Sequence, residues 1–228
     1  MKPSGTIIFD LDGTLTDSRP GILRSTRYAL RRLNETTGRA AAVPEERALA
    51  FMVGPPLRET FAGLVGPDLV ELLLGFYRER YGAVGRFENA IYPGIPQALE
   101  ALRAAGHRLF VATSKNEGDA RRILDHFGLA QFFAQIYGSQ DDGGRAVKDE
   151  LLAFLIAREG IIAGDAVMIG DRKFDALGAR AVGLPTIGAL WGYGSREELR
   201  EAGADPLIEA PGEIVGAVAA VLRRAVRA

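Results

Sequence analysis

The sequence predicts an α/β fold with a doubly wound, mostly parallel sheet and an inserted helical domain. From Ile95 onward, short apolar strands alternate with amphipathic helices, a pattern typical of a parallel sheet that helices cover on both faces. Between the first strand, which begins at Thr6, and Arg86, the chain contains several helical segments and no convincing strand. Polar residues follow four of the apolar strands, and such sheets bind ligands at the carboxyl ends of their strands. A functional site is therefore expected at that edge of the sheet.

This division predicts two domains, a core over residues 1–15 and 87–228 and a helical cap over residues 16–86. The cap is expected to contain helices at 19–35, 44–52, 57–64 and 67–81. The core helices are expected at 95–105, 118–127, 150–159, 174–182 and 214–227. The core strands that alternate with them are expected at 108–113, 134–137, 166–169 and 186–188.

Composition limits the classes of partner. The 228 residues include 28 basic and 29 acidic ones, a formal net charge of −1, which gives no reason to expect nucleic acid or a membrane surface as a partner. The absence of cysteine excludes disulfides and thiolate metal sites. No apolar run is long enough to cross a bilayer and the first five residues do not resemble a signal peptide, so a cytoplasmic location is expected.

Arginine greatly outnumbers lysine in this chain, and the only lysines are Lys2, Lys115, Lys148 and Lys173. A compact ammonium and a planar guanidinium serve different purposes. Each lysine is therefore a candidate for a specific role, the alternative being that these four positions simply escaped the bias.

The first strand runs directly into two carboxylates, Asp10 and Asp12, followed by Gly13. Side chains at i and i+2 share a face of a strand, so the two acids should project together from its end. Like charges this close disfavour ionising together, so one acid can stay protonated while the other acts as a nucleophile or metal ligand. Gly13 lets the chain turn away and leaves room for a ligand. The alternative is a surface turn, because strand ends favour Asp and Gly.

Two further strand ends carry groups that suit an anion. Thr113, Ser114 and Lys115 combine hydroxyls with backbone N–H groups that lead into a helix. An ordinary helix cap is the alternative for this segment. Lys148 precedes the next predicted helix, where the alternative is a solvated loop cation.

The fourth strand end follows the most apolar strand and carries Asp171 and Asp175, one helical turn apart and on the same side. Carboxylates from two neighbouring strand ends suit a hard cation such as Mg²⁺, with water and a substrate phosphate in the remaining positions. Capping of the following helix by Asp171 is the alternative.

The order of these motifs resembles that of the haloacid dehalogenase-like superfamily, which has a Rossmann-like core and, in many members, a helical cap inserted after the first strand. The resemblance covers essentially the whole chain. It is carried by four motifs in the same order and at the same strand ends: Asp10-x-Asp12-Gly13-Thr14, Thr113, Lys148 and Gly170-Asp171-x-x-x-Asp175.

Within the superfamily the chain is similar to the phosphoglycolate phosphatase and 5′-nucleotidase-like branch, on the stretches 54–58, 138–148 and 192–199. One departure is Asp149, because a proline commonly follows the lysine in phosphoglycolate phosphatases. This difference favours the nucleotidase-like relatives.

The resemblance implies a phosphatase that hydrolyses a small phosphorylated metabolite through an aspartyl-phosphate. Asp10 would be the nucleophile, and Asp12 would protonate the leaving oxygen and then activate the hydrolytic water. Lys148 and the Thr113 hydroxyl would hold the equatorial phosphate oxygens.

The same resemblance implies Mg²⁺ as the cofactor, with Asp10, the backbone carbonyl of Asp12 and Asp171 as its ligands, and with Asp175 acting directly or through water. Ser114 and Lys115 would contribute to substrate binding. In the cap, Arg58 is the candidate contact for the leaving group, and a solvated helix cation is the alternative for it.

Asp12 separates this reaction from related ones. Haloacid dehalogenases lack an acid at that position, so Asp12 favours phosphate esters over carbon–halogen bonds. A phosphosugar mutase, which needs the same groups, and a non-catalytic phosphate-binding module remain as alternatives. A receiver-type signalling domain also uses an Asp and a Lys on a doubly wound sheet, but the helical insertion and Asp12 count against it.

Overall fold

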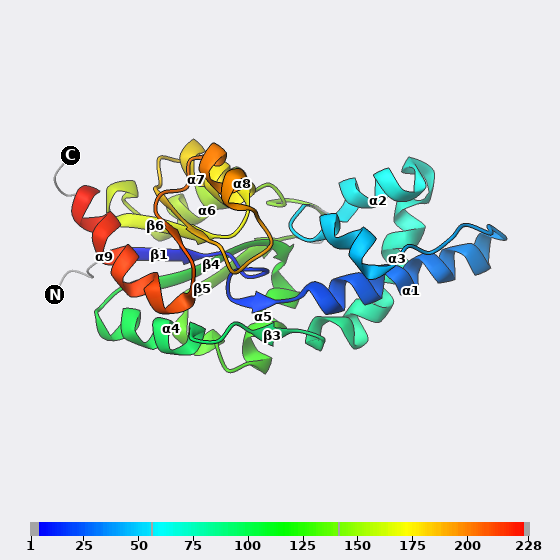
Figure 1. The fold of residues 1–228 in the computed structure, drawn as a ribbon, viewed down its shortest axis with the longest axis horizontal. Helices are drawn as coiled ribbons and strands as arrows, with labels where there is room; N and C mark the ends of the chain where they lie inside the picture. The colour runs from blue at the N-terminus through cyan, green and yellow to red at the C-terminus, as the bar shows by residue number, and fades with distance from the viewer. Residues whose placement is uncertain (1–4, 56, 141, 226–228) are drawn as a thin grey trace. The chain divides into compact units, whose positions relative to one another are not determined.

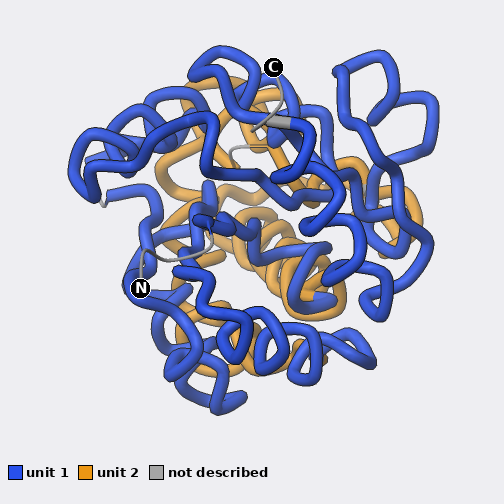
Figure 2. Tube along the Cα trace, turned by 90° about the vertical axis from the view of Figure 1, so that its left-hand side faces the viewer, with its two compact units in different colours: residues 1–17, 91–228 blue, residues 18–90 orange. Residues whose placement is uncertain are grey.

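A computed structural model describes residues 5–55, 57–140 and 142–225. The chain forms two compact units, a core unit of Met1–Asp17 with Ile91–Ala228 and a helical unit of Ser18–Ala90 (Figure 2). The connecting strands β2 (Thr16–Asp17) and β3 (Ala90–Ile91) form a two-stranded sheet. The assignment of residues 16–86 as a cap domain stays a prediction.

The core unit contains a six-stranded sheet in the order β5-β4-β1-β6-β7-β8, with every neighbouring pair parallel (Figure 1). β1 lies inside the sheet, and later strands add on both sides of it. This arrangement confirms the predicted doubly wound α/β fold class. The strands are β1 (Thr6–Phe9), β4 (Arg108–Asn116), β5 (Gln135–Ser139), β6 (Ala166–Gly170), β7 (Thr186–Ala189) and β8 (Leu207–Ile208).

Helices cover both faces of this sheet, which explains why its strands are apolar without alternation. Ile7 and Phe9 face one core cluster and Ile8 faces the other, as the two-residue period of a strand requires. The first cluster includes buried side chains of α4 (Ile95–Ala104), α5 (Glu117–His126) and α9 (Ile214–Ala225). The second includes those of α6 (Lys148–Glu159) and α7 (Lys173–Ala181), which lie on the opposite side of the sheet in Figure 1.

All helices and strands predicted for the core are present, with small shifts at their ends, although residues 226–227 of the closing helix lie outside the described residues. The predictions missed the two-residue strands β2 and β3 and, later in the chain, α8 (Arg196–Ala202) and β8. Segments of two or seven residues are too short for a clear periodic signal.

The helical unit is built around α1 (Arg19–Thr37), which packs along α3 (Val70–Ala83). Its aromatic core includes Tyr77, whose ring lies 5.6 Å from that of Phe61 and 5.2 Å from that of Tyr81. The segment expected as a helix at 44–52 forms a 3₁₀-helix, η1 (Glu46–Met52). The remaining elements are α2 (Leu57–Val65), η2 (Pro67–Leu69) and η3 (Gly85–Phe87).

Among the described residues, no single helix has the length and apolar character needed to cross a membrane. By length and composition alone, the bent pair Leu57–Val65 and Pro67–Ala83 meets that requirement when its two helices are taken together.

Candidate active site

Asp10 lies where the central strand of the sheet ends. Its backbone N–H donates to the Ile169 carbonyl at 2.9 Å, so the parallel ladder between β1 and β6 extends to this residue. The Asp10 side chain is buried, with the residue 8% exposed, which rules out a surface turn for this acid. Because parallel strands end at one edge, residues that follow β4 and β6 lie beside it.

Lys148 connects three of these strand ends. Its Nζ donates to Asp10 Oδ1 at 2.9 Å and to the Ala112 carbonyl at 2.8 Å, and lies 2.8 Å from Asp175 Oδ1. Lys148 is the first residue of α6 and its side chain is 4% exposed, so it is not a solvated loop cation. Burial alone would lower the pKa of Lys148, but the carboxylates of Asp10 and Asp175 outweigh it and raise that pKa above its ordinary value. The ammonium therefore stays charged.

Asp171 is held by two donors in the core unit. The Thr14 hydroxyl donates to its Oδ1 at 3.1 Å, and the Tyr193 backbone N–H donates to its Oδ2 at 2.8 Å. The N-cap of α7 is Arg172, whose N–H donates to Asp175 Oδ2 at 3.1 Å, so Asp171 does not cap this helix.

Three buried carboxylates lie close together in this site, and the Lys148 ammonium pairs with two of them, Asp10 and Asp175. Asp10, Asp171 and Asp175 each offer an oxygen, and these oxygens lie within 4.8 Å of one another. Burial raises the pKa of Asp10 to about 7 against the opposing effect of Lys148, and Asp175 adds to the rise. Burial and the charges of Asp175 and Asp10 also raise the pKa of Asp171 well above its ordinary value, although its hydrogen bonds favour the ionised form.

A cation at this cluster would offset the repulsion among the three carboxylates. All three donors are hard carboxylate oxygens, the ligand type that suits a hard divalent cation. The buried aspartate cluster could therefore bind a metal ion.

Asp12 has a different partner. Its Oδ2 lies 2.8 Å from Nζ of Lys115, and the Thr113 hydroxyl oxygen accepts from the Lys115 N–H at 3.2 Å. Thr113, Ser114 and Lys115 all belong to β4, and Asn116 provides the cap of α5 by accepting from the Asp119 N–H. The three residues are therefore not an ordinary helix cap.

Gly13 is required where the chain leaves β1. Its φ is +88°, and a Cβ there would lie 2.2 Å from Asp171 Oδ2. A side chain at this position would be strained and would displace a carboxylate of the cluster.

Comparison with known proteins decides the family to which this site belongs. A family model described as haloacid dehalogenase-like hydrolase matches residues 7–189. The chain belongs to the haloacid dehalogenase-like hydrolases. It is 45% identical to a 5′-nucleotidase of Pseudomonas aeruginosa over 196 residues, covering 85% of this chain and 86% of the relative. It is therefore a hydrolase with phosphatases among its relatives.

Two further relatives of this hydrolase are informative. The Mycobacterium tuberculosis protein named tyrosine-protein kinase PtkA is 44% identical over 188 residues, which cover 82% of this chain but 62% of the relative's length. A crystal structure described as a predicted phosphatase from Clostridium acetobutylicum matches with a TM-score of 0.84 and 35% identity, over 99% of both chains.

Sequence reasoning missed several residues that shape the hydrolase site. Tyr193 N–H and the Thr14 hydroxyl hold Asp171, and Trp191 Nε1 donates to the Thr14 carbonyl at 3.0 Å. The signal available was that Thr14 and Tyr193 fall inside motif stretches that were recognised without a role for these two residues. Their contacts depend on the path of the loop after β7, which periodicity does not encode.

The expected substrate-binding residues lie in different surroundings. Ser114 is half-buried in β4 of the core unit, and Arg58 is exposed in the helical unit, where it pairs with Glu71. Their contribution to substrate binding, like that of Lys115, stays a prediction.

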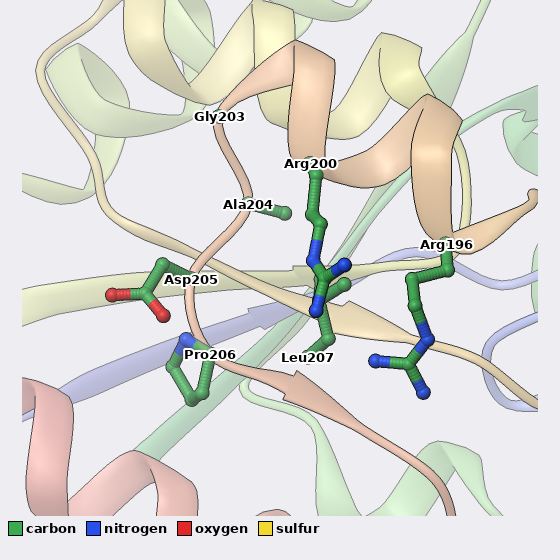
Figure 3. Close-up of a pocket in the computed structure, with 7 residues that line it drawn as sticks. All are labelled: Arg196, Arg200, Gly203, Ala204, Asp205, Pro206 and Leu207. Atoms are coloured by element: carbon green, nitrogen blue, oxygen red, sulfur yellow. The ribbon is translucent and has the colours of Figure 1, made fainter.

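A cavity of about 480 Å³ lies elsewhere in the core unit, between α8 and β8 (Figure 3). None of the acids or lysines described above lines it. Figure 3 shows the side chains of Arg196 and Arg200 extending from α8. The lining residues are Arg196, Arg200, Gly203, Ala204, Asp205, Pro206 and Leu207.

Proposed function

We propose that this hydrolase cleaves small phosphate monoesters, of the 5′-nucleotide or phosphoglycolate type, with Mg²⁺ as its cofactor and an aspartyl-phosphate on Asp10. The observation that carries this proposal is that two neighbouring acids pair with different lysines. Asp10 lies with Lys148 in the buried carboxylate cluster, whereas Asp12 is paired separately with Lys115. These different partners support a role in attack for Asp10 and a role in proton transfer for Asp12.

Asp10, Asp171 and Asp175 would hold the Mg²⁺, together with the Asp12 backbone carbonyl. When bound, the ion would screen the repulsion between the Asp10 carboxylate and the substrate phosphate.

In the first step, a carboxylate oxygen of Asp10 attacks phosphorus while the ester P–O bond breaks. Lys148 fixes Asp10 Oδ1 by a 2.9 Å hydrogen bond, which orients the carboxylate for this attack. Asp12 gives its proton to the leaving oxygen.

In the second step, Asp12 takes a proton from the water that attacks the phosphorus of the aspartyl-phosphate. The bond between phosphorus and the Asp10 oxygen breaks, which releases inorganic phosphate and restores the Asp10 carboxylate. The Thr113 oxygen already accepts from the Lys115 N–H, so its own hydrogen can be donated to a phosphate oxygen. Developing charge on that oxygen would strengthen the bond.

An activity screen tests this function. Purified protein with Mg²⁺ is offered phosphoglycolate, nucleoside 5′-monophosphates, pyrophosphate and phosphosugars, and released phosphate is measured. We expect Mg²⁺-dependent release from at least one monoester. Conversion of a phosphosugar to an isomer without phosphate release would instead identify a mutase, and binding without turnover of any compound would identify a non-catalytic module.

Asp171→Ala is expected to raise the Mg²⁺ concentration for half-maximal activity by more than about tenfold. Loss of a residue that only supports a metal ligand already lowers metal affinity by about that factor, and Asp171 is expected to be a ligand itself. Thermal stability without metal should change far less, since removing one of three clustered carboxylates relieves repulsion. Mg²⁺ titrations of activity and melting curves in a chelator measure both effects. Asp125→Ala, an exposed position on α5, is the control, and an unchanged titration for Asp171→Ala would place the metal elsewhere.

A further inference from the structure

The pairing of Lys115 with Asp12 is built into two neighbouring strands. Lys115 lies near the end of β4, Asp12 follows β1, and these strands are hydrogen-bonded neighbours. Nζ of Lys115 lies 2.8 Å from Asp12 Oδ2, and the two side chains are 8% and 14% exposed. The contact therefore joins the ends of two strands and is largely shielded from solvent.

The two oxygens of Asp12 have unequal surroundings. Oδ2 is held by the Lys115 ammonium, whereas Oδ1 is buried and has no hydrogen-bond partner among the residues that the structure describes. Burying a carboxylate oxygen without a donor is unfavourable, and such groups persist where function uses them. The lysine holds one oxygen, so the other is left available for a reacting group.

We propose that Lys115 is a positioning residue for Asp12: its ammonium holds Oδ2 and thereby presents Oδ1 to the oxygen that gains or loses the proton. This inference rests on the proposed phosphatase function, and it gives Lys115 a role distinct from binding the substrate phosphate. The two buried lysines then divide the acids between them, since Lys148 fixes Asp10 and Lys115 fixes Asp12.

The leaving group of the substrate distinguishes these roles. An alkoxide is a poor leaving group and needs a proton from Asp12, whereas 2,4-dinitrophenolate departs as a stable anion without one. A residue that positions the general acid therefore matters for alkyl phosphates and little for dinitrophenyl phosphate. A residue that binds the phosphate group matters equally for both, because both esters carry the same group.

The test compares kcat/KM of Lys115→Met for the best alkyl phosphate from the substrate screen and for 2,4-dinitrophenyl phosphate. This constant covers the steps up to formation of the aspartyl-phosphate, so the later water-activating role of Asp12 does not enter. We expect a fall of about 10- to 100-fold for the alkyl ester, which is at most the lower end of the roughly 10²–10⁴-fold that general acid catalysis contributes, because Asp12 itself is still present. For the aryl ester we expect a fall of less than about threefold.

Two variants support the comparison. Lys173→Met makes the same substitution at an exposed lysine and should leave both constants unchanged. Lys115→Arg keeps a cationic donor and should restore much of the alkyl-ester activity. If Lys115→Met does not fold, Lys115→Gln is measured with the same pair of esters.

Equal losses on both esters would show that Lys115 contacts the phosphate, and no loss on either would show that the ion pair is dispensable. Either result overturns the inference while leaving the phosphatase function intact. Absence of Mg²⁺-dependent phosphate release by the wild-type protein from both esters would overturn the proposed function and the inference together.

Discussion

Asp10→Asn is expected to abolish phosphatase activity, because an amide is a poor nucleophile and a poor metal ligand. The variant should also fail to trap a phosphate-mimicking fluoride complex with Mg²⁺, which needs the same carboxylate. The measurements are kcat on the best substrate and retention of the fluoride complex after gel filtration. The fold should survive, since the substitution is nearly isosteric and Asp175 still pairs with Lys148.

Asp125→Asn is the matched control, because it makes the same change on the exposed face of α5. If Asp10→Asn kept more than about a tenth of the wild-type kcat, the substitution would raise the activation free energy by less than about 1.4 kcal/mol. That result would remove Asp10 from the role of nucleophile.

Lys148→Arg is expected to fail almost as badly as Lys148→Ala. The Lys148 ammonium fits among Asp10 Oδ1, Asp175 Oδ1 and the Ala112 carbonyl at 2.8–2.9 Å, and a longer planar fork cannot take the same place. The stem is equally confined, because a Cβ at Gly178 of α7 would lie 2.8 Å from Lys148 Cγ. Conservation of charge should therefore not rescue kcat/KM.

Lys148→Ala should in addition lose stability, because it leaves two buried carboxylates without their cation, and breaking a buried pair costs about 3–5 kcal/mol. Lys173→Arg, at an exposed lysine, should behave like the wild type in activity and melting temperature. An active Lys148→Arg enzyme would contradict the claim that this lysine was retained for its shape as well as its charge.

The location of the site was predictable, because the carboxyl ends of parallel strands lie at the same end of the sheet. Apolar runs located β1, β4 and β6, and the polar residues that follow them were expected to meet. The structure brings Asp10, Asp171 and Asp175 within one cluster. Lysine is rare in this arginine-rich chain, so Lys148 could be identified as a candidate for a specific role, and its Nζ pairs with two of these acids.

The partners of the individual side chains were less accessible to sequence reasoning. The hydrogen bond from Trp191 to the Thr14 carbonyl joins residues that are 177 positions apart in the sequence. The hydrogen bond from the Tyr193 N–H to Asp171 joins the loop after β7 to the end of β6. Such contacts depend on loop conformation, for which a single sequence gives no period. The pairing of Lys115 with Asp12 was hidden for a related reason, since strand order became known only from the sheet.

α8 and β8 were missed for a common reason. α8 and β8 lie in the last quarter of the chain, where seven- and two-residue segments are formed by tertiary packing. Leu199 and Ala202 of α8 are buried with Ala176 of α7, a contact that gives this short helix its stability.

The central claim is that phosphate is transferred to Asp10 before water receives it. The most direct measurement mixes enzyme with substrate and Mg²⁺, quenches in acid, and reduces the product with borohydride, which converts an aspartyl-phosphate to homoserine. Mass spectrometry of the peptide that contains Asp10 is expected to show homoserine at residue 10, and none when substrate is omitted. An unmodified Asp10 under conditions of rapid turnover, with homoserine formed at another aspartate or at none, would contradict the covalent mechanism.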